Sequence, residues 1–344
     1  GLRKPEPTDF YNVDDFNFNA DVIDTELFAV KQKADQTESD LAAHLNDFAH
    51  FNPPRGIKKI DIIVPVGDPG EWDEKIREFG NILYDPDDPG KEYKLFYSGF
   101  QGDYLGNNVY VGYAYSSDGE TWTKGGRLNI GRSAEDPYVV KHNGIYYLYV
   151  EDKEVVPFRN IRLFTSTDFI NWTDQGVVLD VGTGWESQDV SSPTVFVEDG
   201  IFYMFYEGRA PGQEGAIGLA TSQDGITWTK YNNNPVVKPN NPDYFANPDI
   251  HWATAIVPDD IKVIGEFYQM IFHASMQNHI GIKKWVPGIL ISKNKTSWVD
   301  CLGLPISVPD SKNVMIDTIM FTPDGLYIFV DESGIWRGLA VENK

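Results

Sequence analysis

Polar and apolar positions alternate along this chain in short stretches, and five groups of such stretches share one order. Each group has a first apolar stretch, a Gly-containing turn, a strongly aromatic stretch, a loop and a third apolar stretch. The aromatic stretches are found at 91–99, 144–152, 200–208, 265–274 and 325–332. Short apolar and aromatic stretches joined by Gly, Asn and Asp turns, with little helical periodicity, are typical of β-strands. We therefore predict five repeated β units.

A short phrase follows the third stretch in four of these units. It reads SSDGETW at 116–122, STDFINW at 166–172, SQDGITW at 222–228 and SKNKTSW at 292–298. Its tryptophans at 122, 172, 228 and 298 are 50, 56 and 70 residues apart. That spacing is about the size of one propeller blade, and Asp and Gly suit tight turns. We interpret the phrase as a joint of the scaffold and not as an active site.

These units predict an all-β fold, a five-bladed β-propeller over residues 68–344. The fifth unit lacks an outer strand, and an unpaired sheet edge is a liability. The N-terminal extension, residues 1–67, can supply that strand from LFAVKQK at 27–33 or IDIIVPV at 60–66. Between them we expect one short helix at 37–50, with Thr37 as its cap.

Composition narrows the class of protein. The chain has 344 residues, of which 41% are hydrophobic and 14% aromatic, so it is globular. Its formal net charge of −22 argues against binding to nucleic acid or to an anionic membrane. Cys301 is the single cysteine, which excludes a disulfide within the chain and a cysteine-based metal site. The sequence contains no run of eighteen apolar residues, so it predicts no membrane-spanning helix.

Candidate chemistry lies where the first strand of each unit begins, because these starts should converge on the propeller axis. Acidic residues are frequent there. Trp72-Asp73 and Trp185-Glu186 each stand eight residues before an expected inner strand, and Asp136 opens the inner strand of the second unit. A Trp ring can stack on a sugar and raise the pKa of a neighbouring acid. Glycoside hydrolysis usually needs two such carboxyl groups.

The chain resembles the five-bladed propeller glycosidases grouped around glycoside hydrolase families 43, 62, 32, 68, 117 and 130. The likeness covers residues 68–344 and is carried by EDPYVVKHNGIYYLY at 135–149, SPTVFVEDGIFYMFY at 192–206 and the repeated turns. The resemblance implies that Asp73 is the base, Asp136 the supporting carboxylate and Glu186 the acid. Asp73 lies further from its strand than the family pattern has it, with Glu78 nearer.

Further residues near the same ends of the strands are expected to contact the sugar. They are Trp72, Arg132, Trp185, Asp189, Glu207, Arg209, Asp249, His251, Trp252, His273 and Asp317. The chemistry requires no cofactor. Carboxylate oxygens at the axis suit a structural calcium ion, although no acidic loop has EF-hand spacing.

We therefore expect a glycoside hydrolase that acts on an oligo- or polysaccharide, in a secreted or periplasmic location rather than a cytoplasmic one. This hypothesis requires Asp73, Asp136 and Glu186 to share one pocket. Two alternatives stay open. A phosphorylase would use inorganic phosphate as the nucleophile and need basic residues, to which Arg132, Arg209 and His273 could contribute. A non-catalytic sugar-binding propeller would bind glycan without cleaving it.

Overall fold

The computed structural model describes ten segments of the chain: 56–104, 108–154, 158–213, 215–239, 253–264, 266–277, 283–300, 315–318, 326–331 and 334–341. The chain divides into two units, residues 1–53 and residues 54–344, and every described residue belongs to the second. The expected helix at 37–50 and the alternative closing strand at 27–33 lie outside the described residues. Within the described segments, no helix is long and apolar enough to cross a membrane.

The described residues form five four-stranded antiparallel sheets, here called blades one to five. In blades one to four the strands follow one another in chain order. Blade one contains β2 (Lys75–Tyr84), β3 (Tyr93–Phe100), β4 (Val109–Ser116) and β5 (Thr123–Arg127). Blade two contains β6 (Ala134–His142), β7 (Ile145–Asp152), β8 (Ile161–Ser166) and β9 (Thr173–Leu179).

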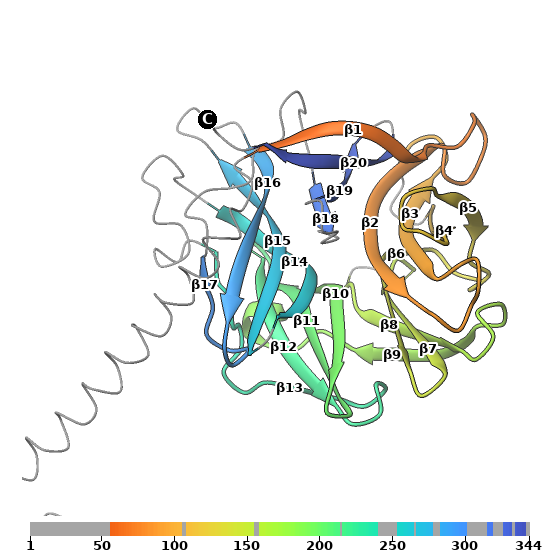
Figure 1. Ribbon diagram of the computed structural model, residues 1–344. Helices are drawn as coiled ribbons and strands as arrows, with labels where there is room; N and C mark the ends of the chain where they lie inside the picture. The colour runs from red at the N-terminus through yellow and green to blue at the C-terminus, as the bar shows by residue number, and fades with distance from the viewer. Residues whose placement is uncertain are drawn as a thin grey trace, which may run out of the picture. The chain divides into compact units, whose positions relative to one another are not determined.

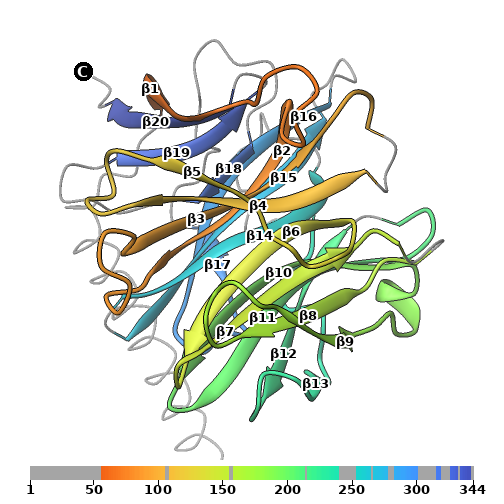
Figure 2. The same ribbon diagram turned by 90° about the vertical axis from the view of Figure 1, so that its right-hand side faces the viewer.

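Blades three and four repeat this arrangement. Blade three contains β10 (Asp189–Glu198), β11 (Ile201–Arg209), β12 (Ala216–Ser222) and β13 (Trp228–Lys230), and a short 3-10 turn, η2 (Gly184–Glu186), precedes it. Blade four contains β14 (Ala253–Ile264), β15 (Phe267–Gln277), β16 (Lys283–Ser292) and β17 (Val299–Asp300). The side-by-side placement of blades one and two is visible in Figure 2.

Blade five is built from both ends of the second unit. It contains β18 (Met315–Thr318), β19 (Leu326–Asp331), β20 (Gly334–Val341) and, at its outer edge, β1 (Gly56–Pro65). β1 pairs antiparallel with β20, and Arg337 donates to both carboxylate oxygens of Asp61 at 2.9 Å. The second of the two expected closing strands therefore completes this sheet. Because β1 belongs to the second unit, that unit begins before the boundary predicted at residue 67.

The blades surround a common axis (Figure 1), with the first strand of each blade innermost. Each of these strands, β2, β6, β10, β14 and β18, contacts the next, and β18 contacts β2. The expected all-β, propeller-like architecture is therefore confirmed.

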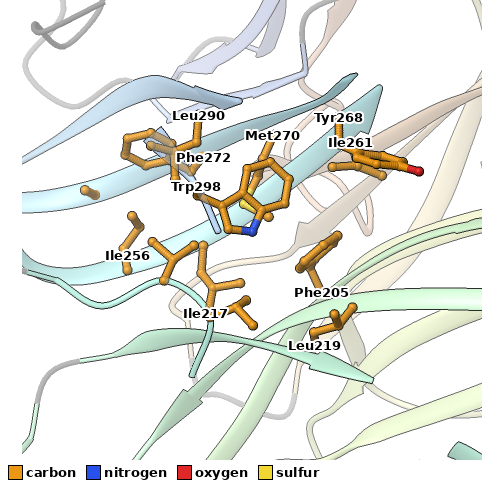
Figure 3. Packing of buried hydrophobic residues seen from close by; sticks show 13 residues of the cluster. Phe205, Ile217, Leu219, Ile256, Ile261, Tyr268, Met270, Phe272, Leu290 and Trp298 are labelled. Atoms are coloured by element: carbon orange, nitrogen blue, oxygen red, sulfur yellow. The ribbon is translucent and has the colours of Figure 1, made fainter. Parts of the chain in front are cut away.

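The hydrophobic core lies between neighbouring blades. Between blades three and four, the Trp298 indole packs edge-on against Phe205, with ring centres 5.3 Å apart, beside Met270 and Ile256 (Figure 3). Similar clusters fill the spaces between blades one and two and between blades two and three. Because an interior strand contributes side chains to the clusters on both of its faces, the aromatic strands β3 and β7 are buried almost continuously along their length.

The repeated phrase forms the same turn in four blades. At 222–228, the Asp224 carboxylate accepts hydrogen bonds from the backbone N–H groups of Ile226 and Thr227 at 2.8 and 2.7 Å. The indole N–H of Trp228 donates to the Gly225 carbonyl at 3.1 Å. These bonds satisfy backbone groups that the sheet leaves unpaired. They support the interpretation of the phrase as a joint.

Replacing the turn carboxylate tests its structural role. We expect Asp224→Ala to lower the free energy of unfolding by about 1 kcal/mol, because two backbone N–H groups lose their acceptor. Asp224→Asn should unfold close to wild type, since Asn294 occupies the same place in blade four and accepts from Thr296 and Ser297 at 3.1 and 2.9 Å. Urea denaturation measures both variants, and equal losses would contradict the assignment.

Candidate active site

A pocket of about 550 Å³ lies where the inner strands of blades one to four converge. Its walls are unusually rich in ionisable groups. The acidic residues are Glu78, Glu135, Asp136, Glu151, Glu207 and Asp259. The basic residues are Arg77, Arg159, Arg209 and His273. The pocket therefore combines groups from four blades, as a site for a polar ligand requires.

Bulges in the inner strands aim these side chains into the pocket. The pairing register of β6 with β7 shifts between Glu135 and Tyr138, and that of β10 with β11 shifts between Ser191 and Thr194. Asp136 and Ser192 lie in these shifts, and both have φ of 50°, in the left-handed region. Such backbone conformations are unfavourable for residues other than glycine and concentrate at functional sites. A bulge also redirects a side chain from the sheet.

Asp136 and Glu78 form a hydrogen-bonded carboxyl pair with opposite proton affinities. Burial and the charge of Asp136 raise the pKa of Glu78 well above its usual range. Burial also tends to raise the pKa of Asp136, but hydrogen bonds from Glu78 and Ser192 outweigh it and hold that pKa below its usual range. Ser192 Oγ donates to Asp136 Oδ2 at 2.6 Å. Glu78 therefore holds the proton and Asp136 the charge.

Burial also raises the pKa of three other carboxyl groups of the pocket. Burial raises the pKa of Glu207, although the charges of Arg209 and His273 oppose the change. Burial and nearby carboxylates raise the pKa of Glu151 to about 8 and hold that of Asp259 well above its usual range. Asp136, whose pKa is lowered, therefore lies among carboxyl groups whose pKa values are raised, a division that acid–base catalysis uses.

A chain of ion pairs fixes the wall between blades one and two. Lys153 Nζ lies 2.6 Å from Glu135 and 2.8 Å from Glu151, and both carboxylates are almost fully buried. Tyr104 donates to Glu135 at 3.0 Å, and Arg77 stacks on the Tyr104 ring at 4.3 Å and pairs with Glu135. Because buried charges need such partners, the network holds this wall in one arrangement.

One cluster in the described part of the chain has the ligand atoms for a metal ion. Oxygen atoms of Glu78, Glu135 and Asp136 lie within 4.8 Å of one another. Carboxylates of this kind suit calcium. Here, however, Arg77 and Lys153 balance Glu135, and Glu78 holds the proton of its pair with Asp136. The cluster is charge-balanced by protein groups, and the structural calcium ion stays a prediction.

Asp73 does not belong to this pocket. Its carboxylate accepts a hydrogen bond from the Tyr97 hydroxyl at 2.9 Å and pairs with Lys124 at 2.7 Å. Both partners are residues of blade one, and the Asp73 side chain is 4% exposed. The expectation that Asp73 shares a pocket with Asp136 is therefore wrong, because its carboxylate contacts residues on the second and fourth strands of its own blade.

Glu186 occupies the equivalent position in blade three. It accepts from the Tyr206 hydroxyl at 2.8 Å and pairs with Lys230 at 2.9 Å, and it does not line the pocket. The expectation that Glu186 shares the pocket with Asp136 is wrong for the same reason. The matching eight-residue spacings in the sequence mark a repeated structural contact.

The tryptophans before these acids are packing residues. Trp72 stacks on Tyr97 with ring centres 5.3 Å apart, and Trp185 stacks on Tyr206 at 6.0 Å. Trp72 also covers Gly112, where a Cβ atom would lie 2.2 Å from the indole. Neither ring lines the pocket, so their expected role as sugar platforms is corrected.

Other predicted contacts divide into those inside and those outside the pocket. Glu207, Arg209 and His273 line it, as Asp136 does. Asp189 is buried behind Arg209, which donates to it from Nε at 3.0 Å. Arg132 is outside the pocket because it pairs with Asp152 at 3.0 Å.

The remaining predicted contacts are Asp249, His251, Trp252 and Asp317. Asp249, His251 and Trp252 lie outside the described residues. Asp317 lies in β18, and its side chain is likewise outside what the structure describes.

Sequence reasoning missed several pocket residues, of which Asp259 is the clearest. β14 begins at Ala253, and one of its register shifts relative to β15 lies between Pro258 and Asp260. Asp259 at that bulge lines the pocket and contacts His273 Nδ1 at 2.6 Å. Pro137 and Pro193 mark the corresponding bulges in blades two and three, so Pro258 was the available signal. No comparable signal pointed to Arg159.

Comparison with known proteins agrees with this architecture. Residues 127–233 match the model of Glycosyl hydrolases family 43. A protein of Mycobacterium tuberculosis described as uncharacterized is 28% identical over 190 residues, which cover 48% of this chain and 62% of that protein. The chain thus matches less than two thirds of the length of its curated relatives.

Solved structures share the fold at low sequence identity. One described as a glycoside hydrolase has a TM-score of 0.65 and 15% identity over 88% of this chain and 96% of that one. A family 117 glycoside hydrolase of the marine bacterium Zobellia galactanivorans has a TM-score of 0.53 and 16% identity over 82% and 81%. The resemblance to the propeller glycoside hydrolases is confirmed, and its sequence match is centred on blades two and three.

Amide variants of the two misassigned acids separate structure from chemistry. We expect Asp73→Asn and Glu186→Gln to lower the free energy of unfolding by about 1 kcal/mol each, because each loses an ion pair with a lysine. Neither should change turnover of a cleaved glycoside substantially, since neither side chain reaches the pocket. Denaturation curves and initial rates check both expectations, and loss of turnover with an intact fold would restore the sequence-based roles.

Proposed function

We propose that this chain is a five-bladed propeller glycoside hydrolase whose acid–base pair is Glu207 and Asp136. The observation that carries the proposal is the division of proton affinities in the pocket. Asp136 is held in its charged form while the neighbouring carboxyl groups are driven toward the neutral form. Cleavage of a glycosidic bond needs one ionised and one protonated carboxyl group near neutral pH.

Asp136 is the proposed general base. It takes a proton from water as the water oxygen attacks the anomeric carbon. Ser192 and Glu78 both donate hydrogen bonds to this carboxylate and hold it in place. Glu78 is thus a positioning residue in blade one, where the sequence-based scheme expected the base.

Glu207 is the proposed general acid. It gives its proton to the leaving oxygen as the bond from the anomeric carbon to that oxygen breaks. Ser191 Oγ donates to Glu207 Oε2 at 3.2 Å and orients the carboxyl group. This places the acid in blade three, where the resemblance implied it, but on β11 rather than before β10.

Two alternatives receive less support. A phosphorylase uses inorganic phosphate as the nucleophile and needs no carboxylate base, whereas this pocket holds Asp136, whose pKa is lowered, together with Glu207, whose pKa is raised. A pure sugar-binding pocket usually offers an exposed aromatic face for stacking. Apart from His273, the aromatic residues among the described lining are Phe79 and Tyr138, which are 4% and 5% exposed. A secreted or periplasmic location stays a prediction.

Substitution of the proposed pair tests the mechanism. We expect Asp136→Asn and Glu207→Gln each to lower kcat/KM about 10²- to 10⁴-fold, because each removes one proton-transfer group. Glu198→Gln is a matched control, since Glu198 is bound by Tyr268 and Lys295 outside the pocket. A panel of nitrophenyl glycosides and polysaccharides, assayed with and without phosphate, identifies the substrate. Wild-type rates for both pocket variants, or turnover that requires phosphate, would overturn the proposal.

The pH dependence of kcat/KM has a predicted shape. Activity requires Asp136 to be ionised, so the acid limb lies below the usual aspartate range, because its pKa is lowered. Activity also requires Glu207 to keep its proton, so the alkaline limb lies above the usual glutamate range, because its pKa is raised. In Glu207→Gln the alkaline limb should disappear from the residual activity. An unchanged profile in that variant would assign the acid to another residue.

A further inference from the structure

Two arginines flank one buried aspartate at the wall of the pocket. Arg159 forms a parallel bridge with Asp189, and Asp189 is paired with Arg209 across β10 and β11. The Val190 N–H donates to the Arg159 carbonyl at 3.1 Å, which fixes the approach of blade two to blade three. Both arginine side chains line the pocket and are 39% exposed. The fold therefore presents two guanidinium groups on one side of the cavity.

Both groups retain donors for a ligand. Arg159 uses Nη1 toward Glu151 at 3.0 Å, and Arg209 uses Nε and Nη2 toward Asp189. These contacts with described residues occupy one nitrogen of Arg159 and two of Arg209. Arg77 differs, because it is stacked on Tyr104 and lies between two carboxylates. Guanidinium groups with exposed N–H donors match the geometry of a carboxylate or a sulfate.

The charge of the pocket differs from that of the chain as a whole. Burial raises the pKa of four of the six lining carboxyl groups, Glu78, Glu151, Glu207 and Asp259. A raised pKa reduces the ionised fraction of these carboxyl groups and therefore their repulsion of an anionic ligand. An arginine keeps its positive charge. A chain with a formal net charge of −22 thus contains a cavity in which an anion can be bound.

We propose that Arg159 and Arg209 bind an anionic substituent of the sugar, the carboxylate of a uronic acid or a sulfate ester. The inference rests on the proposed function, because it names the substrate class of the same pocket. Asp189 and Glu151 hold the guanidinium groups in place before the ligand binds, which reduces the entropy lost on binding. Glu207 lies opposite Ser191 on the strand that also carries Arg209, so the charged substituent would position the sugar beside the proposed acid.

Binding is measured first, without reference to turnover. Wild-type protein is titrated calorimetrically with glucuronate, galacturonate and glucose 6-sulfate, with glucose and galactose as neutral counterparts, and with inorganic phosphate and sulfate. We expect one class of anionic sugar to bind at least about tenfold more tightly than its neutral counterpart, with affinity falling as salt rises. The uronate and sulfate arms distinguish the two substituents. Equal binding of neutral and anionic sugars overturns the inference.

Substitutions then locate the site. We expect Arg159→Gln and Arg209→Gln each to remove most of the preference for the anionic sugar, about tenfold, and the lysine variants to retain part of it. Arg162→Gln is the matched control, because Arg162 pairs with buried Asp152 at 2.7 Å but does not line the pocket. Melting curves confirm that each variant is folded. If a glutamine variant does not fold, the lysine variant at the same position is compared with wild type instead. The assignment is contradicted if both glutamine variants still prefer the anionic sugar. It is also contradicted if the lysine and glutamine variants retain this preference equally.

The two proposals fail differently. Selective binding of anionic sugars without cleavage of any glycoside retains this inference and removes the proposed hydrolase. Cleavage of neutral glycosides with no anionic preference retains the hydrolase and removes this inference. If the protein binds inorganic phosphate but no anionic sugar, and the arginine variants lose this binding, then Arg159 and Arg209 form a phosphate site. That outcome overturns the inference.

Discussion

The close approach of the inner strands at the axis is the constraint on which the pocket depends. A Cβ atom on Gly80 would lie 1.8 Å from the carbonyl oxygen of Pro137, so the backbones of blades one and two touch there. Polar side chains satisfy the groups buried by this approach. Asn81 exchanges two hydrogen bonds of 2.9 Å with the backbone of Val139, and Tyr138 donates to Asp260 of blade four at 2.6 Å. The bulges that accommodate this crowding are the places from which acidic side chains enter the cavity.

Charge compensation decides which of those acids can act. The carboxylates of the wall between blades one and two form ion pairs with Lys153 and Arg77. These ion pairs hold the carboxylates in place and leave them less available for proton transfer. Asp136 instead receives hydrogen bonds from a hydroxyl and a protonated carboxyl group and stays charged without a directly bonded cation. Glu207 has weaker compensation and keeps its proton more readily. Carboxyl groups of similar intrinsic acidity thus acquire different proton affinities from their partners.

The sequence predicted more of the scaffold than of the site. The repeated order of apolar stretches, aromatic stretches and turn phrases located the strands and the closing strand, because packing between blades imposes this pattern locally. Asp136 was found for a similar reason, since Asp-Pro opens an inner strand at a bulge. Asp73 and Glu186 were misplaced because a repeated Trp-acid pair has the composition of a sugar site and the function of a packing contact. Partners such as Lys124 and Lys230 are distant in sequence, and no local pattern predicts them.

The pairing of β1 with β20 has a consequence for how the protein is made. Gly56 lies opposite Val341, so this sheet joins residues that are separated by nearly the whole sequence of the second unit. The two strands therefore leave the ribosome far apart in time. Contacts of such long sequence separation form late and slow folding, since the intervening chain must first be ordered. Blades two and three, which consist of consecutive strands, can form during synthesis. β20, which is translated after the strands of the other four blades, therefore completes the fifth sheet.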